Sequence, residues 1–211
     1  MNVTLLTKTP EFSRVIWAAG RTCHSGCTPE ELFAHPDDES KRLKLIDFLM
    51  KSRHLSTLEH CSATFAVSDV SRTLLAQYSR HRIGVSLSVQ SQRYVSARSE
   101  RVGHFPLVLP RGLKNEEAKA RFEQAMDDAQ KAYDDLVALG VPMEDARFVL
   151  PGAASTNFVT TVNLRSMIDL YEKRVLVKGA QWEVRELIQR MAELLVEAEP
   201  WLAPYFPKPQ D

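Results

Sequence analysis

The sequence lacks a surplus of basic residues. Its 211 residues include 27 Lys or Arg and 27 Asp or Glu, so the formal net charge is zero. Proteins that bind nucleic acids or membrane surfaces through charge usually carry a basic surplus. The composition therefore argues against both kinds of partner.

Long apolar runs are missing as well. No stretch approaches the ~18 apolar residues that a membrane-spanning helix requires. Residues 1–15 also lack the basic segment and the long apolar segment that mark a secretory signal. We therefore expect neither a membrane span nor a signal peptide.

Cysteine is scarce. Three residues, Cys23, Cys27 and Cys61, cannot all pair within one chain, and a chain of this length can bury a core without disulfides. We therefore expect a cytoplasmic protein. Cys23 and Cys27 form a CxxxC pair without a second ligand pair, and none of the three has the setting of a catalytic nucleophile.

Several chemical motifs are absent. The sequence contains neither GxGxxG nor GxxxxGK[ST], the loops of the two common nucleotide-binding folds. It has no HExxH, and His54 and His60 lie six residues apart, a spacing that does not put them on one helical face, so no metal site is predicted. It has no GxSxG, and no serine is paired with an obvious base.

What is present is an irregular mixture of strand and helix patterns. Strands are expected at residues 5–9, 60–67 and 155–162. Helices are expected within residues 37–54, from a cap at Ser68 and Asp69 to about residue 79, and at residues 115–139, 143–150, 163–173 and 180–199. The second helix would place Gln77, Arg80 and His81 on one face. Because strands and helices do not alternate regularly, we expect one α+β domain over residues 1–211.

The most unusual segment is basic. Residues 79–101 contain five arginines and one glutamate, a local charge of about +4 in a chain of zero net charge. Arginine presents a planar fork of donors that fits phosphate oxygens in pairs. The segment is compatible with a nucleic-acid patch, a solvated strand with outward arginines, or a pocket for a phosphorylated small molecule. Its many short polar residues favour the pocket.

Three further arginines lie beside apolar residues. They are Arg147 in "EDARFVLP", Arg165 in "TVNLRSM" and Arg174 in "YEKR". The structural alternative for each is an ion pair, and Arg165 with Asp169 at i+4 is the obvious example.

Five segments in order resemble the flavin-dependent thymidylate synthases. "RHRIGVSLSVQSQRY" is similar to the family's signature, an RHR followed by a serine and an "xRY". "LIDFLMKSRHLSTLEH" resembles the upstream block, "GVPMEDARFVLP" and "TVNLRSMIDLYEKR" resemble two downstream blocks, and "AQWEVR" resembles the start of the final helix. The resemblance covers nearly the whole chain.

This resemblance implies an α+β fold with a mixed or antiparallel sheet flanked by helices, and a helical subdomain. It implies a homotetramer with active sites built at subunit interfaces. The implied reaction is reductive methylation of dUMP to dTMP. Methylenetetrahydrofolate supplies the carbon, NADPH reduces FAD, and the flavin supplies the hydride, without a cysteine nucleophile on the enzyme.

The resemblance also implies roles for individual residues. Flavin contacts are implied for Ser56, Glu59, Arg80, His81, Arg82, Asn163, Arg165 and Asp169. Contacts with dUMP are implied for Gln77, Arg80, Gln90, Ser91, Gln92, Arg93, Arg147 and Arg174, with arginines on its phosphate. Arg174 and Ser91 match catalytic positions. Arg174 is implied to favour uracil deprotonated at N3, because a guanidinium stabilises an anion that develops beside it.

The chain departs from the family's pattern in three places. The segment from Ile83 to Gln90 is one residue longer than usual, and we expect the extra residue within "IGV", where Gly84 would allow a bulge. Val89 stands where relatives mostly have Glu or Gln, and Gln90 is expected to take over that contact. Gly179 replaces a histidine. The altered segment leaves open a rival, a flavoprotein that modifies another pyrimidine nucleotide.

Overall fold

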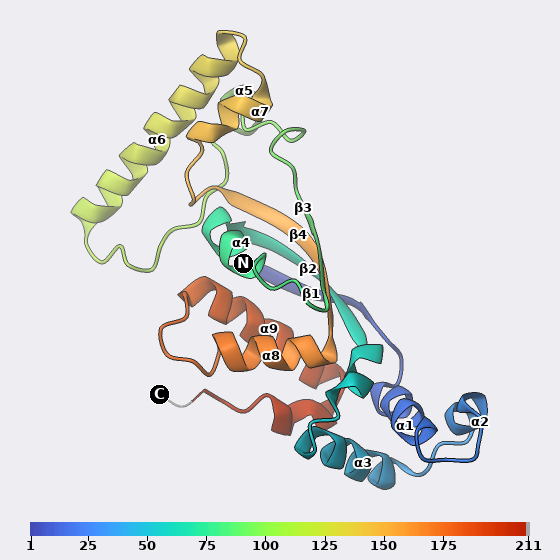
Figure 1. Cartoon of the computed structure of the whole chain (residues 1–211). Coiled ribbons are helices and arrows are strands. Elements are labelled where there is room, and N and C mark those ends of the chain that lie inside the picture. Colours follow the sequence, from blue (N-terminus) through green and yellow to red (C-terminus); the bar gives the residue numbers. More distant parts are fainter. Residues whose placement is uncertain (210–211) are drawn as a thin grey trace. The chain divides into compact units, whose positions relative to one another are not determined.

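The computed structural model describes residues 1–209, and Figure 1 shows its elements in chain order. Four strands form one antiparallel sheet in the order β1-β2-β4-β3, with bounds Asn2–Lys8 (β1), Ser62–Ser71 (β2), Val85–Val89 (β3) and Ser155–Asn163 (β4). The α-helices are α1 (Phe12–Thr22), α2 (Pro29–Ala34), α3 (Glu39–Lys51), α4 (Arg72–Tyr78), α5 (Ser99–Val102), α6 (Glu116–Ala138), α7 (Met143–Ala146), α8 (Leu164–Arg174) and α9 (Trp182–Ala198). Three 3₁₀ helices are η1 (Leu55–His60), η2 (Arg147–Val149) and η3 (Pro200–Tyr205). The predicted α+β class is confirmed.

Most predicted elements are present, but the start of α4 was predicted wrongly. Ser68 and Asp69 do not cap the helix, because β2 continues to Ser71. Asp69 adopts a left-handed φ of 58° within the strand, and its backbone N–H donates to the Asn157 side chain at 3.1 Å. Ser71 is the true cap, and its hydroxyl accepts from the Leu74 N–H at 2.9 Å.

The predicted common face of Gln77, Arg80 and His81 was also wrong. Helix α4 ends at Tyr78, so Arg80 and His81 lie beyond it and do not follow its periodicity. A helical face extends only as far as the helical backbone does.

The sequence analysis missed α1 and α2. Helix α1 follows Glu11, which has a left-handed φ of 49° and makes no side-chain cap bond, so no conventional start signal precedes it. Helix α2 does carry a signal: Thr28 and Glu31 form a capping box with Pro29 inside it.

The chain divides into two compact units. The α6 unit comprises residues 1–2, 67–80 and 88–158, and the α8–α9 unit comprises residues 3–66, 81–87 and the segment that begins at Val159. Each strand contributes residues to both units. That the chain folds as one domain over residues 1–211 stays a prediction.

In the α6 unit, one buried amide on α6 organises the chain that leads to it. The Gln130 Oε1 accepts from the Phe105 N–H at 2.7 Å, and its Nε2 donates to the Ala97 carbonyl at 2.9 Å and to Asp134 at 3.1 Å. Asp134 also accepts from the Ser99 N–H. Satisfying these buried backbone groups fixes the loop against α6. The apolar core beside it consists of Phe105, Met126 and Ala154, with Leu107, Phe122 and Leu150 around them.

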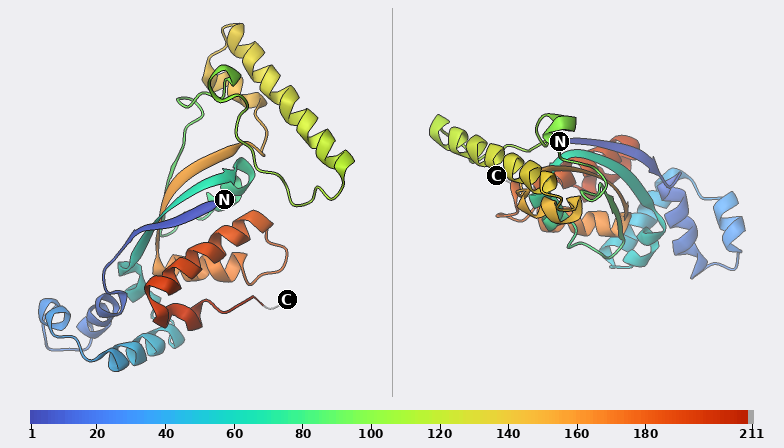
Figure 2. Two further views of the ribbon diagram at one scale, coloured as in Figure 1. Left: turned by 180° about the vertical axis from the view of Figure 1, so that it is seen from behind. Right: turned by 90° about the horizontal axis from the view of Figure 1, so that it is seen from above.

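In the α8–α9 unit, the two last α-helices lie side by side (Figures 1 and 2). Both turn an apolar stripe inward, and the buried apolar residues are Leu164, Met167, Leu170 and Tyr171 of α8 and Val184, Leu187, Ile188, Met191, Ala192 and Leu195 of α9. This packing holds the start of α8, which carries several predicted site residues, on a rigid element.

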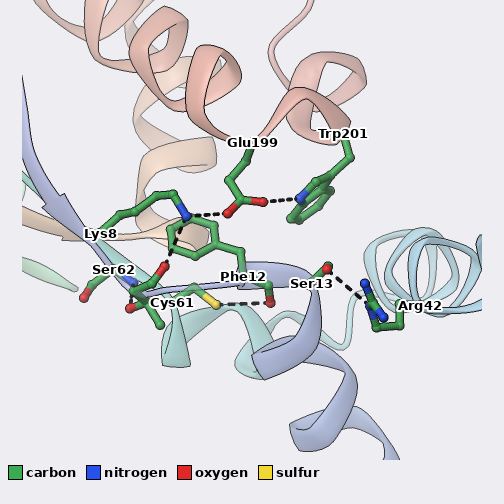
Figure 3. Close-up of polar contacts among 9 residues, drawn as sticks. Lys8, Phe12, Ser13, Arg42, Cys61, Ser62, Glu199 and Trp201 are labelled. Atoms are coloured by element: carbon green, nitrogen blue, oxygen red, sulfur yellow. Dashed lines mark hydrogen bonds and ion pairs between the residues drawn. The ribbon is translucent and has the colours of Figure 1, made fainter. Parts of the chain in front are cut away.

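A partly buried ion pair joins β1 to the end of α9 (Figure 3). The Lys8 Nζ contacts the Glu199 carboxylate, and their side chains are 20% and 13% exposed. The Trp201 Nε1 donates to the other Glu199 oxygen at 2.7 Å, and Lys8 also lies over the Phe12 ring. Breaking such a pair costs more than a surface pair contributes, because one charge stays behind without a partner.

Replacing Glu199 with glutamine should therefore lower the free energy of unfolding by about 2 kcal/mol, since Lys8 loses its counter-ion and Trp201 its charged acceptor. Asp47→Asn is a matched control, because Asp47 pairs with Lys51 at 2.6 Å but the two side chains are 48% and 76% exposed. That control should cost less than about 0.5 kcal/mol. Urea denaturation of the three proteins checks the difference, and equal midpoints would contradict it.

Candidate functional site

A groove of about 630 Å³ lies in the α8–α9 unit. Its apolar side chains are those of Met50, Leu55, Leu58, Ile83 and Ile168, and its charged ones are those of Lys51, Arg53, Arg165, Asp169, Glu172 and Lys173. A groove lined by apolar side chains together with several cations suits a ligand that combines a flat ring with phosphate groups. Two predicted flavin contacts, Arg165 and Asp169, line this groove.

Glu59, another predicted flavin contact, forms an ion pair with Arg165. The Glu59 carboxylate accepts from Arg165 Nη1 at 2.5 Å, across 106 residues of sequence. The expected i,i+4 pair of Arg165 with Asp169 is replaced, since Asp169 pairs with Lys173 at 2.8 Å. Ser56 is exposed on η1, the same short helix that carries Glu59.

The turn that follows the RHR sequence is fastened to the start of α8. The Ser166 hydroxyl donates to the Ile83 carbonyl at 2.9 Å, and the Asn163 N–H donates to the Gly84 carbonyl at 3.0 Å. The Asn163 Oδ1 also caps α8 by accepting from the Ser166 N–H at 2.8 Å. Asn163, a predicted flavin contact, thus has a structural task as well.

Gly84 is required in this turn. Its φ is +64°, and a Cβ atom at this position would lie 2.3 Å from both Asn163 Nδ2 and Ser166 Oγ. The expected bulge at Gly84 is instead a turn that ends where β3 begins. That the additional residue lies within "IGV" stays a prediction.

The predicted catalytic arginine contacts the predicted flavin histidine. Arg174 Nε donates to His81 Nε2 at 2.9 Å, although the two residues are 93 positions apart. Arg174 is partly buried at the end of α8, whereas Arg82 is exposed. The end of α8 therefore supplies a guanidinium whose direction is set by the imidazole.

Two arginines that are predicted to bind phosphate, Arg93 and Arg147, lie in the α6 unit, and both contact Glu144. Arg93 Nη2 pairs with the Glu144 carboxylate at 2.8 Å, and Arg147 Nε donates to the Glu144 carbonyl at 2.9 Å. Glu144 was missed by the sequence analysis. Its place three residues before Arg147 was a usable signal, since i,i+3 residues are neighbours on a helical turn.

The other predicted nucleotide contacts flank this pair along the chain. Gln90 directly follows β3, and its backbone N–H donates to the Asn157 carbonyl at 2.9 Å, while its Oε1 accepts from the Asn157 Nδ2 at 3.1 Å. Ser91 accepts from the Arg93 N–H at 3.2 Å and so shapes the turn that contains Gln92. Gln77 lies on α4, and Arg80 is exposed just beyond it. Among the predicted nucleotide contacts, Arg174 alone belongs to the α8–α9 unit.

The cysteines are free: Cys23 and Cys27 are exposed and Cys61 is buried. Burial, with a smaller effect of the nearby Glu199 charge, raises the pKa of Cys61 to about 12. A thiol with this pKa is protonated at neutral pH and a poor nucleophile. Over residues 1–209, no cluster of three or more His, Cys, Asp or Glu side chains could hold a metal ion. No helix in that range is long and apolar enough to cross a membrane.

Comparison with known sequences identifies relatives over most of the chain. The sequence profile of the family described as "Thymidylate synthase complementing protein" matches residues 4–201. The flavin-dependent thymidylate synthase of Nitratidesulfovibrio vulgaris is 40% identical over 213 residues, covering 95% of this chain and 84% of its own. That of Geobacter sulfurreducens is 39% identical over 201 residues, with the same shares of each chain.

Comparison with solved structures points to the same family as the sequence comparison. The flavin-dependent thymidylate synthase of Helicobacter pylori, complexed with FAD and dUMP, is 26% identical, with a TM-score of 0.74 over 96% of this chain and 97% of its own. A UMP/dUMP methylase from Streptomyces cacaoi has a TM-score of 0.76 over 97% of this chain and 92% of its own, and at 22% identity the likeness concerns the fold. From the matched profile, the relatives and the fold together, we conclude that this chain belongs to the thymidylate synthase complementing protein family, the flavin-dependent thymidylate synthases.

Proposed function

We propose that this protein converts dUMP to dTMP with methylenetetrahydrofolate as the carbon donor and NADPH as the reductant of a bound FAD. The observation that carries the proposal is the groove beside α8, which is lined by Arg165 and Asp169. The chain is 26% identical to a thymidylate synthase that was solved with FAD and dUMP.

The groove fits a flavin dinucleotide by its chemistry. Its apolar side chains can cover a ring system, and its lysines and arginines can bind the pyrophosphate. We propose that Arg165, Asn163, Asp169 and Ser56 hold the cofactor, that Glu59 holds Arg165 in place, and that the Arg80–His81–Arg82 segment lies beside the ring. When bound, FAD supplies hydride transfer, which no amino-acid side chain provides.

The α6 unit is proposed to bind the nucleotide. Arg93 and Arg147 would bind its phosphate, since a guanidinium offers two parallel donors to phosphate oxygens. Arg80, Gln77 and the segment from Gln90 to Gln92 would bind the remaining polar groups, with Ser91 at the position implied to be catalytic.

Arg174 would act on the uracil. A guanidinium lowers the pKa of a group whose anion it contacts, so Arg174 would favour the uracil deprotonated at N3. Its bond to His81 supports this role, because a side chain that is already oriented loses little freedom when the substrate arrives.

We also propose a cytoplasmic homotetramer with shared active sites. Several large apolar side chains are exposed in the single chain, with Ile83 90%, Phe148 83% and Tyr94 78% exposed. Exposed apolar groups of this size often mark interfaces or ligand sites. Light scattering should then give four times the chain mass of 23.9 kDa.

The visible absorption spectrum and a substrate comparison test the proposed function. The purified protein, after addition of FAD, should show bound flavin and should form dTMP from dUMP with NADPH and methylenetetrahydrofolate. Preferred turnover of UMP or dCMP would identify the rival pyrimidine-modifying flavoprotein. If the protein bound no FAD, both the proposed thymidylate synthase activity and the rival flavoprotein activity would be overturned.

The same assay tests the absence of a cysteine nucleophile. A variant with Cys23, Cys27 and Cys61 replaced by serine should form dTMP at a rate within about twofold of the wild type, because the reaction needs no thiolate. Inactivity of a folded, FAD-binding variant would indicate a covalent mechanism through cysteine.

A further inference from the structure

Helix α3 ends in a turn in which glycine is the usual residue. The Arg53 N–H donates to the Met50 carbonyl at 3.2 Å, and the His54 N–H donates to the Leu49 carbonyl at 2.9 Å. These two bonds form a Schellman motif, whose residue after the helix cap is left-handed and usually glycine. Here that residue is Arg53, with a φ of 61°. An arginine in this conformation costs energy that a glycine would not cost, which points to a task for its side chain.

The Arg53 side chain lines the groove beside α8. Each of the other cations of the groove has a carboxylate partner, and the pairs are Lys51 with Asp47 at 2.6 Å, Arg165 with Glu59 at 2.5 Å and Lys173 with Asp169 at 2.8 Å. The Arg53 guanidinium makes neither an ion pair nor a hydrogen bond within residues 1–209. Arg53 is therefore the groove cation that is available, in that part of the chain, to an anionic ligand.

A cation at the end of a helix also interacts favourably with the helix dipole. Lys51 already supplies such a charge in the last turn of α3, where the backbone is helical. The dipole therefore does not explain why residue 53 is an arginine in a left-handed conformation. Arg53 lies within "LIDFLMKSRHLSTLEH", but the resemblance of that segment implies no role for it.

We propose that Arg53 binds the 2′-phosphate of NADPH and thereby makes the protein select NADPH over NADH. This inference rests on the proposed function, since it takes the groove to hold FAD and NADPH to be the reductant. A reductant has to reach the flavin, so it enters the groove that holds the flavin. A guanidinium offers parallel donors to phosphate oxygens, and an arginine is a common partner of a ribose 2′-phosphate.

The charges of Arg53 and Lys51 together match a phosphate monoester. Such a group carries about two negative charges near neutral pH. Arg53 supplies one positive charge. Lys51 lines the same groove and can supply the second, because its pair with Asp47 is largely exposed and contributes little. A carboxylate of methylenetetrahydrofolate carries one charge and would balance only half of this pair.

Binding measurements on the FAD-loaded protein test the inference, with NADP⁺ and NAD⁺ as probes. Arg53→Gln should weaken NADP⁺ binding roughly 10- to 100-fold, the effect of losing one charge-assisted contact. It should leave the affinities for NAD⁺ and FAD within about twofold, since neither carries a 2′-phosphate. Arg53→Lys keeps the charge without the fork and should lie between the wild type and Arg53→Gln. The KM values for NADPH and NADH in flavin reduction should show the same difference.

A glycine variant adds a readout that does not depend on activity. Arg53→Gly should weaken NADP⁺ binding as Arg53→Gln does and should raise the melting temperature by about 2–4 °C, because glycine adopts the left-handed conformation without strain. Lys44→Gln is the matched control. Lys44 is exposed on α3 and does not line the groove, so both quantities should stay as in the wild type.

Four outcomes would overturn the inference. Arg53→Gln could bind NADP⁺ no more weakly than Lys44→Gln. It could lose NADP⁺ and NAD⁺ alike, or lose FAD, which would assign Arg53 to a pyrophosphate. It could raise the KM for methylenetetrahydrofolate and not that for NADPH, which would assign it to a carboxylate. Arg53→Gly could lower the melting temperature and leave NADP⁺ binding unchanged, which would assign it to the end of α3.

Failure of the proposed function is distinguishable from failure of this inference. A wild type that binds FAD and forms no dTMP, but prefers NADP⁺ over NAD⁺ through Arg53, would refute the reaction and retain the 2′-phosphate site.

Discussion

Replacing Gly84 with alanine is expected to weaken FAD binding by at least about tenfold and to lower the free energy of unfolding by about 3 kcal/mol. An alanine at a φ of +64° costs roughly 1–2 kcal/mol by itself. The new Cβ would also lie 2.3 Å from Asn163 Nδ2 and Ser166 Oγ, so both side chains would have to move. Their movement breaks the cap of α8 and the bond to the Ile83 carbonyl.

The loss of FAD affinity follows from the position of the turn. It comes directly after Arg82, and the same movement displaces Asn163, so two proposed flavin contacts shift together. Ile83, which lines the groove, shifts as well. Denaturant unfolding and flavin fluorescence titration measure the two effects.

Alanine variants at two other glycines distinguish the cost of the positive φ from the cost of the steric clash with α8. Gly103 has a φ of +74°, and a Cβ added there would meet no atom within 4 Å, so Gly103→Ala should show the conformational cost alone, about 1–2 kcal/mol. Gly26 has neither a positive φ nor a close neighbour, so Gly26→Ala should be close to neutral. If Gly84→Ala behaved like Gly103→Ala, the contact with α8 would have no energetic importance.

Replacing Arg174 with alanine is expected to lower kcat for dTMP formation by roughly 10²- to 10³-fold, the usual effect of removing a group that stabilises developing charge. FAD binding should stay within about twofold of the wild type, since Arg174 is proposed to contact the nucleotide and not the flavin. Rapid-quench assays and the visible spectrum measure the two quantities in the same preparation.

A conservative variant and a distant control complete this experiment. Arg174→Lys keeps a positive charge but cannot reproduce the direction set by the bond to His81, so it should recover only part of the rate. Arg190→Ala removes an exposed arginine that pairs with Glu193 on the same helix and should leave the rate unchanged. Loss of FAD from Arg174→Ala with undiminished turnover after reconstitution would contradict the assignment.

Much of the fold follows from local pattern. The apolar spacing of residues 115–139 predicted α6, and Asn115 caps it as expected of an asparagine before a helix. Alternation in residues 60–67 predicted most of β2. The exceptions depend on contacts between distant residues, which local sequence patterns do not display. Asp69 stays in the strand through bonds to Asn2 and Asn157, which lie far away along the chain.

Periodicity and motif spacing are local properties of the chain, and they were enough to predict the α+β class and the family, which the structure and the comparisons confirmed, whereas the roles of the site residues stay predictions. Which distant side chains meet was known only from the packed structure. It placed Glu59 against Arg165, His81 against Arg174, and the Gly84 turn against α8. Burial and contact between residues about 100 positions apart depend on how whole elements pack, and local spacing carries no information about that packing.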